Sequence, residues 1–256
     1  MPSYATYLQL DSLLALQQAG DEHDEMLFLI IHQSYELWFK EILHETDHLQ
    51  RLLEGGELAR AGHTIKRVLT ILKMLVAKVD ILETMTPLEF TGFRQRLESG
   101  SGFQSAQFRE IEFALGHKSP HALEQFPPQS NERSRLERRY HARALWDSFL
   151  AYLTLAGYPL PDPLRDRDVT RPVEPSPALQ QILTRIYRQD PPIAEFCERL
   201  VDLDEGMQEW RYRHVKMVER TIGVKPGTGG TSGAEYLRTT LLQPVFPDLW
   251  AVRAEF

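Results

Sequence analysis

The 256-residue sequence has one cysteine, no long apolar run and no excess of positive charge. Its single cysteine, Cys197, excludes an internal disulfide, an iron–sulfur cluster and the C-x-x-C-H attachment of c-type haem. The longest clean apolar run, Met26 to Ile31, is far shorter than the ~20 residues of a membrane span. The N-terminus lacks the basic and apolar regions of a signal peptide. We therefore expect a cytoplasmic protein with no membrane contact.

The charge balance is acidic. The formal net charge is −7 and the sequence pI is about 5.7, so a phosphate-backbone partner is not favoured and no nucleic-acid binding is expected. Basic stretches at 138–139 and 211–214 lie in helical patterns among acidic residues. They are typical of solvated helix faces or ligand contacts.

Strand signals are almost absent, and nearly every long segment has helical periodicity. The sequence predicts an all-α fold of long antiparallel helices in a single domain, residues 1–256. The apolar stretch 26–43 predicts a helix buried on nearly all sides. Six prolines in 158–179 argue against regular structure there, and the segment is either a linker or an ordered connection. Further helices are predicted over 58–85, 87–97, 133–156, from 179, and 193–219.

One short motif suggests zinc. His44-Glu45-Thr46-Asp47-His48 has the H-E-x-x-H spacing that places two histidines on one helix face. Asp47 puts a charge between the histidines, and no convincing third ligand follows. The segment also lies at the polar end of its helix, so a solvated helix face is the favoured interpretation.

Two other residues allow both a plain and a functional interpretation. His32 lies among Phe28, Tyr35 and Phe39, where a histidine is more often a satisfied core residue, although an apolar pocket also needs one directional hydrogen bond. Arg94 follows Phe90 by one helical turn and is either a surface arginine or an anchor for a carboxylate.

The C-terminal third contains a glycine-rich loop and an isolated histidine. The loop KPGTGGTSG, 225–233, fails the nucleotide-loop pattern because its lysine precedes the glycines; it is a surface turn or a loop that closes on a small anion. His214, on the preceding helix, meets the minimal requirement for a proximal haem ligand, which alone is a weak signal.

Taken together, four blocks resemble the tryptophan 2,3-dioxygenase family, in that family's order and spacing. They are the opening YATYL, HDEMLFLIIHQSYELWFKEIL, FTGFRQRLESGSGFQSAQFREIE and WRYRHVKMVERTIGVKPGTGGTSGAEYLR. The blocks span residues 4 to 238, and the stretch 118–199 matches less distinctively. The resemblance implies an all-helical haem protein that opens the indole ring of L-tryptophan with O₂ to give N-formyl-L-kynurenine, the first step of tryptophan degradation.

The resemblance also implies roles for individual residues. His214 matches the proximal ligand of haem b, one per subunit and ferrous in the active form, and His32 matches the distal histidine that hydrogen-bonds the indole N–H. Trp210 and Arg211 are inferred to contact His214 or the haem propionates. Residues 1–20 are expected to complete a neighbouring subunit's pocket in a homotetramer built from dimers. The remaining substrate-binding positions are Phe28, Phe90, Arg94, Ser101, Thr228, Tyr4, Tyr7 and Leu8.

Two departures from the family pattern accompany this resemblance. Position 90 is Phe where some relatives carry Tyr, so one hydroxyl near the carboxylate is missing, and the chain is short for the family. An alternative within the family is a haem enzyme that acts on a modified tryptophan or gives a monooxygenated product. Outside it, a zinc peptidase and a helical binding module without catalysis remain.

Overall fold

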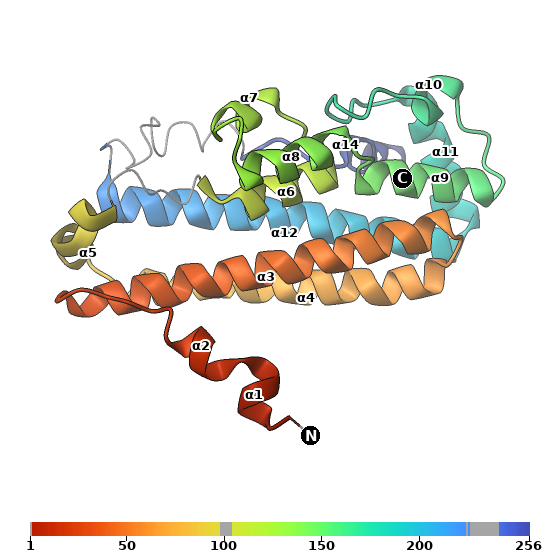
Figure 1. Ribbon diagram of the computed structural model, residues 1–256. Helices are drawn as coiled ribbons and strands as arrows, with labels where there is room; N and C mark the ends of the chain where they lie inside the picture. The colour runs from red at the N-terminus through yellow and green to blue at the C-terminus, as the bar shows by residue number, and fades with distance from the viewer. Residues whose placement is uncertain (1, 98–103, 224, 226–240) are drawn as a thin grey trace.

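The computed structural model describes residues 2–97, 104–223, 225 and 241–256, and every regular element in these residues is helical. The prediction of an all-α fold is confirmed. Three long helices, α3 (His23–Glu54), α4 (Leu58–Leu82) and α12 (Pro191–Ile222), run side by side along the molecule (Figure 1). None of the described helices is long and apolar enough to cross a membrane.

The turn between α3 and α4 and the approach of α4 to α12 both depend on glycine. Gly56 has a φ of 77°, a left-handed conformation that glycine adopts at little cost, and it lets α4 return antiparallel to α3. A Cβ on Gly206 of α12 would lie 2.8 Å from Cδ2 of Leu72 on α4. The absence of a side chain at Gly206 therefore allows the close packing of these two helices.

Shorter helices cover the three long ones. Helices α6 and α9 pack on α3, α8 packs on α6, and α11 packs on α12 (Figure 1). Helix α5 lies at one end of the bundle, against α3 and α12. The bounds are α1 Tyr4–Leu8, α2 Leu10–Leu14, α5 Pro87–Arg94, η1 Gln95–Leu97, α6 Ala106–Leu115, α7 Pro120–Glu124, α8 Asn131–His141, α9 Leu145–Leu155, α10 Asp162–Arg165, α11 Pro177–Gln189, α14 Pro247–Ala251 and η3 Val252–Glu255.

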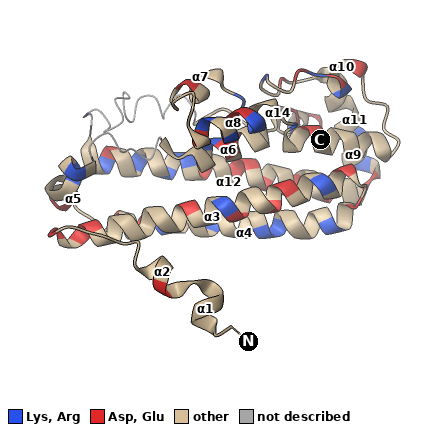
Figure 2. Cartoon of the chain, in the orientation of Figure 1, with Lys and Arg blue, Asp and Glu red and all other residues tan. Residues whose placement is uncertain are grey.

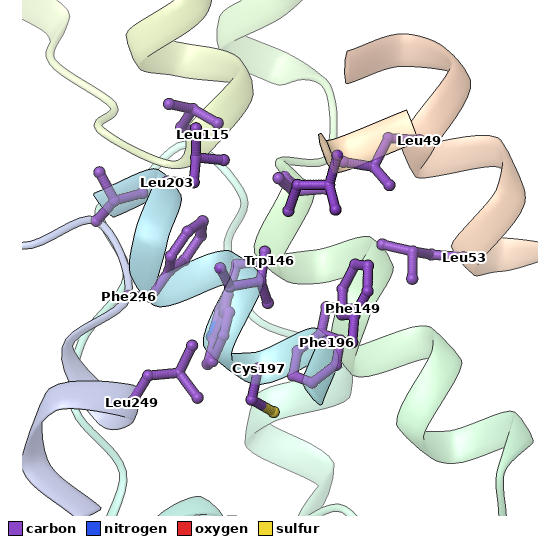
Figure 3. Packing of buried hydrophobic residues seen from close by; sticks show 14 of the residues in the cluster. Leu49, Leu53, Leu115, Trp146, Phe149, Phe196, Cys197, Leu203, Phe246 and Leu249 are labelled. Carbon is purple, nitrogen blue, oxygen red and sulfur yellow. The ribbon is translucent and has the colours of Figure 1, made fainter. Parts of the chain in front are cut away.

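The largest apolar cluster joins α3, α4, α6, α9, α11, α12 and the C-terminal tail, and its aromatic stacks lie where α9, α12 and the tail meet (Figure 3). Trp146 stacks on Phe246 with ring centroids 5.3 Å apart, and Phe149 stacks on Phe196 at 5.7 Å. All four side chains are at most 2 % exposed. Burial of this much aromatic surface is a main source of the free energy that holds α9 and the C-terminal tail against α12.

A buried carboxylate attaches the C-terminal tail to α12. Asp204 is fully buried and accepts hydrogen bonds from the backbone N–H groups of Val245 and Phe246 at 2.8 and 2.9 Å and from Trp250 Nε1 at 2.9 Å. A buried carboxyl group is tolerated only when it is well hydrogen-bonded, and Gln208 Nε2, at 3.0 Å from the other oxygen, is a fourth donor. The tail is thereby held against the same helix that carries His214.

Several predicted helix boundaries are wrong. The single helix predicted over 133–156 is two helices, α8 and α9, separated by extended backbone at Ala142 (ψ 159°). Lys118 explains the break, because its Nζ donates to the backbone carbonyls of Arg139, Tyr140 and Ala142 at 2.6 to 3.1 Å. A contact from a distant residue thus replaces the helical hydrogen bonds, and no local pattern reveals it.

Two further boundaries differ. The helix predicted over 58–85 ends at Leu82, because Thr86 caps the next helix. The proline-rich segment contains one short helix, α10, and α11 begins within it at Pro177, where proline suits the first helical turn.

The prediction that residues 26–43 are buried on nearly all sides is also wrong. Ile30 and Leu37, two turns apart on one face of α3, are 50 % and 53 % exposed. The buried face carries Ile31, Phe39 and Ile42. The apolar run therefore covers two faces of α3. One face packs against the rest of the chain, and the other is exposed to solvent in the single subunit.

Helices α1 and α2 project from the bundle as an arm (Figure 1). None of their residues is buried, and Tyr4 and Tyr7 are 77 % and 76 % exposed. Figure 2 shows that the arm carries almost no charge; Asp11 is the one charged residue in 1–20. Such a charge-poor, aromatic surface is typical of a segment that contacts another protein surface.

Candidate functional site

Three helices bring the predicted site residues to one end of the bundle. The N-terminal part of α3, helix α5 and the C-terminal part of α12 meet there (Figure 1). An apolar cluster joins them, in which Phe28, Phe90 and Met217 are partly buried around Ile31 and the fully buried Phe93. The site is therefore built on long, well-packed helices, which hold side chains more rigidly than loops do.

His32 points along α3 toward Phe28. Its Nδ1 lies 2.7 Å from the backbone carbonyl oxygen of Phe28, and the two rings are 3.9 Å apart. A carbonyl only accepts, so Nδ1 carries the hydrogen and Nε2 keeps its lone pair. Burial lowers the pKa of His32, outweighing the Phe28 carbonyl and Glu36, which raise it. His32 is therefore a neutral imidazole with one acceptor nitrogen.

Helix α5 supplies an aromatic wall and a cation. A capping box at Thr86 and Glu89 fixes its start, so the position of the helix is well determined. The Phe90 ring lies 6.0 Å from that of Phe28, and the Phe93 ring packs edge-on against both at 5.4 Å. Arg94, half-buried, is the last residue of α5.

His214 lies on the α12 side of the site. Its ring stacks on Trp210, one turn earlier, with centroids 5.0 Å apart and planes 16° apart, and Trp210 in turn packs on Phe108 of α6 at 4.4 Å. Burial lowers the pKa of His214 to about 4, and His32 and Arg109 act in the same direction. The imidazole is neutral near pH 7, the form that binds a metal.

A buried ionic network lies beside His214. Glu112 of α6 contacts Arg109 at 2.5 Å and Arg211 at 3.3 Å, and Arg211 also donates to the backbone carbonyl of Gln243 at 3.3 Å. The three charged residues are each at most 8 % exposed. Arg211 thus links α6, α12 and the tail, next to the helical turn that carries His214.

The remaining predicted positions divide into two groups. Tyr4, Tyr7 and Leu8 lie on the projecting arm, and the structure does not bring them to the site of their own chain (Figure 1). Ser101 and Thr228 lie outside the described residues. Their assignments stay predictions.

The H-E-x-x-H segment makes contacts of another kind. Glu45 is 5 % exposed and pairs with Arg67 at 2.6 Å, and Asp47 forms an ion pair with Arg139 of α8. His44 lines an open polar groove between α3, α6 and α8. Within the described ranges, no three His, Cys, Asp or Glu side chains are grouped to hold a metal ion.

Comparison with known proteins gives one result throughout. A family model described as Tryptophan 2,3-dioxygenase matches residues 2–147 and 175–256. The chain belongs to the tryptophan 2,3-dioxygenase family. A relative of that name from Herpetosiphon aurantiacus is 59% identical over 256 residues, covering 99% of this chain and 98% of the relative. Others from Anaeromyxobacter sp. (strain K) and Bacillus anthracis are 54% and 41% identical, over 98% and 99% of this chain.

These relatives sharpen two points about the family resemblance. This chain spans 98%, 95% and 92% of their lengths, so it is not short beside these members of the tryptophan 2,3-dioxygenase family. The part of this chain that the family model leaves unmatched, 148–174, falls in the less distinctive stretch and includes most of the proline-rich segment. The blocks that carry the site residues all lie in matched segments.

Several residues that shape this site were not among the predicted site residues. Phe93 packs against both Phe28 and Phe90, Phe108 carries the Trp210 ring, and Glu112 joins two arginines. The i, i+3 spacing of Arg109 and Glu112 on an amphipathic helix was a usable signal. The contact of Glu112 with Arg211, 99 positions away, could not be predicted from any local sequence signal.

Proposed function

We propose that this protein is a haem b-dependent dioxygenase that inserts O₂ into the indole ring of L-tryptophan to give N-formyl-L-kynurenine. The observation that carries the proposal is the pair of neutral histidines, His32 and His214, brought to one site from α3 and α12 in a chain of this family. Two relatives named tryptophan 2,3-dioxygenase, at 59% and 54% identity, support it.

The residues on the α12 side fit a haem. His214 is a neutral imidazole that stacks on Trp210, and it would hold the haem iron. Two buried donors on this side, Trp210 Nε1 and Arg109 Nε, have no hydrogen-bond partner among the described residues. Haem propionates are acceptors of the kind such donors need. When bound, the haem supplies the binding and activation of O₂.

The residues on the α3 and α5 side fit an indole with an amino-acid end. Phe28 and Phe90 offer aromatic walls to the ring, and Nε2 of His32 is an acceptor for the indole N–H. Arg94 would pair with the substrate carboxylate, and a pocket closed around tryptophan would exclude water from this pair. Nε2 of His32 would accept a hydrogen bond from the indole N–H, while Nδ1–H stays bonded to the carbonyl oxygen of Phe28.

A homotetramer built from dimers is part of the proposal. The exposed Tyr4 and Tyr7 on a charge-poor arm, and the half-exposed Ile30 and Leu37 on α3, are apolar surfaces that a second subunit would cover. Removal of residues 1–10 should weaken tryptophan turnover while haem stays bound. An unchanged KM and kcat in the truncated protein would contradict this role for the arm.

An isotope experiment tests the reaction and separates it from the monooxygenase alternative. The haem-loaded, reduced protein is given L-tryptophan and ¹⁸O₂, and the product is analysed by mass spectrometry. Incorporation of both oxygen atoms into N-formyl-L-kynurenine is expected. One labelled atom would indicate a monooxygenase, and no product with haem bound would refute the proposed activity. A protein that takes up no haem would refute the cofactor as well.

A further inference from the structure

Glu112 is a buried acid at the contact between α6 and α12. Its Oε2 accepts from Arg109 on its own helix at 2.5 Å, and its Oε1 accepts from Arg211 on α12 at 3.3 Å. Burial alone would raise the pKa of Glu112, but the two guanidinium groups outweigh it and lower the pKa. The carboxylate is therefore ionised, and it offsets part of the charge of two buried arginines.

This acid is connected to His214 by two routes. Arg211 precedes His214 by three residues on α12, so both lie on the same side of the helix. Arg109 follows Phe108, whose ring packs on Trp210 and, through it, on His214. Because Arg109 also acts electrostatically on His214, a change in the charge of the network reaches the imidazole directly.

We propose that Glu112 is a positioning residue of the proximal side: it fixes α6 against α12 and, by offsetting the charge of Arg109 and Arg211, sets the reduction potential of a haem iron held by His214. This inference rests on the proposed haem-binding function. Uncompensated positive charge near the iron favours the ferrous state, which is one unit less positive than the ferric state. Loss of the Glu112 charge should therefore make the midpoint potential more positive.

The test compares Glu112→Gln with wild type in the haem-loaded protein. Glutamine has nearly the same shape and still accepts a hydrogen bond, but it carries no charge. Reduction is followed through the Soret band, with dithionite as the electron donor and a set of redox dyes. A more positive midpoint potential is expected, so that several-fold less ferric protein remains at a given potential.

Two further variants separate charge from simple loss of structure. Arg109→Gln removes a positive charge from the same network and should move the midpoint potential in the opposite direction. Asp147→Asn is the matched control, because Asp147 is another buried acid paired with an arginine. It lies on α9 and accepts a hydrogen bond at 3.0 Å from Arg167 in the proline-rich segment. This variant should lower the melting temperature without moving the potential.

The outcomes are distinguishable. An unchanged potential in Glu112→Gln, or shifts of the same sign in Glu112→Gln and Arg109→Gln, would overturn the role of Glu112 while leaving the proposed function intact. If Glu112→Gln does not fold, the double variant Glu112→Gln/Arg109→Gln, which removes one charge of each sign, decides. A midpoint potential close to that of wild type supports the role of Glu112, and one as negative as that of Arg109→Gln alone overturns it. A wild-type protein that binds no haem would refute the proposed function instead.

Discussion

The α3–α5 side and the α6–α12 side of the site differ in how firmly they hold their histidines. His32 bonds to a carbonyl of its own helix and lies against Phe28, with few polar ties to other elements. His214 is stacked on Trp210, which rests on Phe108, beside a buried network that joins α6, α12 and the tail.

This difference suggests a division of labour. A group that stays bound needs a rigid, pre-organised seat, whereas a substrate that comes and goes needs apolar walls and a few directional contacts. The α6–α12 side is the rigid, pre-organised site, and the α3–α5 side offers apolar walls with few directional contacts. Variants on one side should therefore change substrate binding, and variants on the other should change haem binding.

Arg94→Ala should give the largest effect on the substrate side. Removing one partner of a charge-assisted pair in a partly desolvated pocket costs ~2–5 kcal/mol, or roughly thirty-fold to several-thousand-fold in the Kd for L-tryptophan. Haem content should stay at the wild-type value. The measurement is a tryptophan titration of the Soret band.

Arg96→Ala is the control for Arg94, because Arg96 pairs with Glu25 at 2.9 Å. It should change tryptophan affinity far less. Tryptamine, which lacks the carboxylate, gives a second control: wild type and Arg94→Ala should bind it poorly and about equally. A loss of tryptamine affinity as severe as that of tryptophan would make Arg94 a structural residue.

Trp210→Ala tests the other side. Losing a partly buried indole and its ring contacts with Phe39, Phe108 and His214 should lower the free energy of unfolding by roughly 2–3 kcal/mol. Haem should also dissociate faster, because stacking on Trp210 no longer holds the plane of His214. Haem transfer to apomyoglobin measures the dissociation rate. Trp210→Phe should restore most of the stability and most of the haem retention. Equal haem dissociation rates in Trp210→Ala and wild type would contradict the role of Trp210 in holding His214.

His32→Ala should have a smaller effect on tryptophan binding than Arg94→Ala. One hydrogen bond to a neutral N–H is worth about 0.5–1.5 kcal/mol, or about two- to twelve-fold in Kd. Some turnover should remain. An affinity loss larger than that of Arg94→Ala would reverse the assigned roles of the two residues.

The smallest effect concerns pH. Burial places the pKa of His32 below the ordinary 6.5, and only the neutral form has the lone pair that accepts the indole N–H. Tryptophan affinity should therefore be flat from pH 8 to 6.5 and fall only at lower pH, as the imidazole becomes protonated. His32→Gln, which cannot protonate, should lack this acidic limb. A decline that begins above pH 6.5 in wild type would contradict the lowered pKa.

The fold class and the shared face of Phe28 and His32 followed from helical periodicity, because residues one turn apart share a helix face. The place of Phe90 beside them, on another helix, was implied only by the family blocks. The break between α8 and α9 was not predictable, since Lys118 makes it from 21 to 24 positions away. The exposed face of α3 was missed for another reason. Apolar residues on all sides of a helix look the same in sequence whether they contact this chain or another surface.

Haem content in two variants separates the proposed role of His214, which is to hold the haem, from that of His32, which is to contact the substrate. His32→Ala and His214→Ala are produced under the same haem-replete conditions and compared with wild type by Soret absorbance per protein. We expect near-wild-type haem content in His32→Ala and loss of stable haem in His214→Ala. A full, unshifted Soret band in His214→Ala, or an equal loss in both variants, would contradict this assignment of roles.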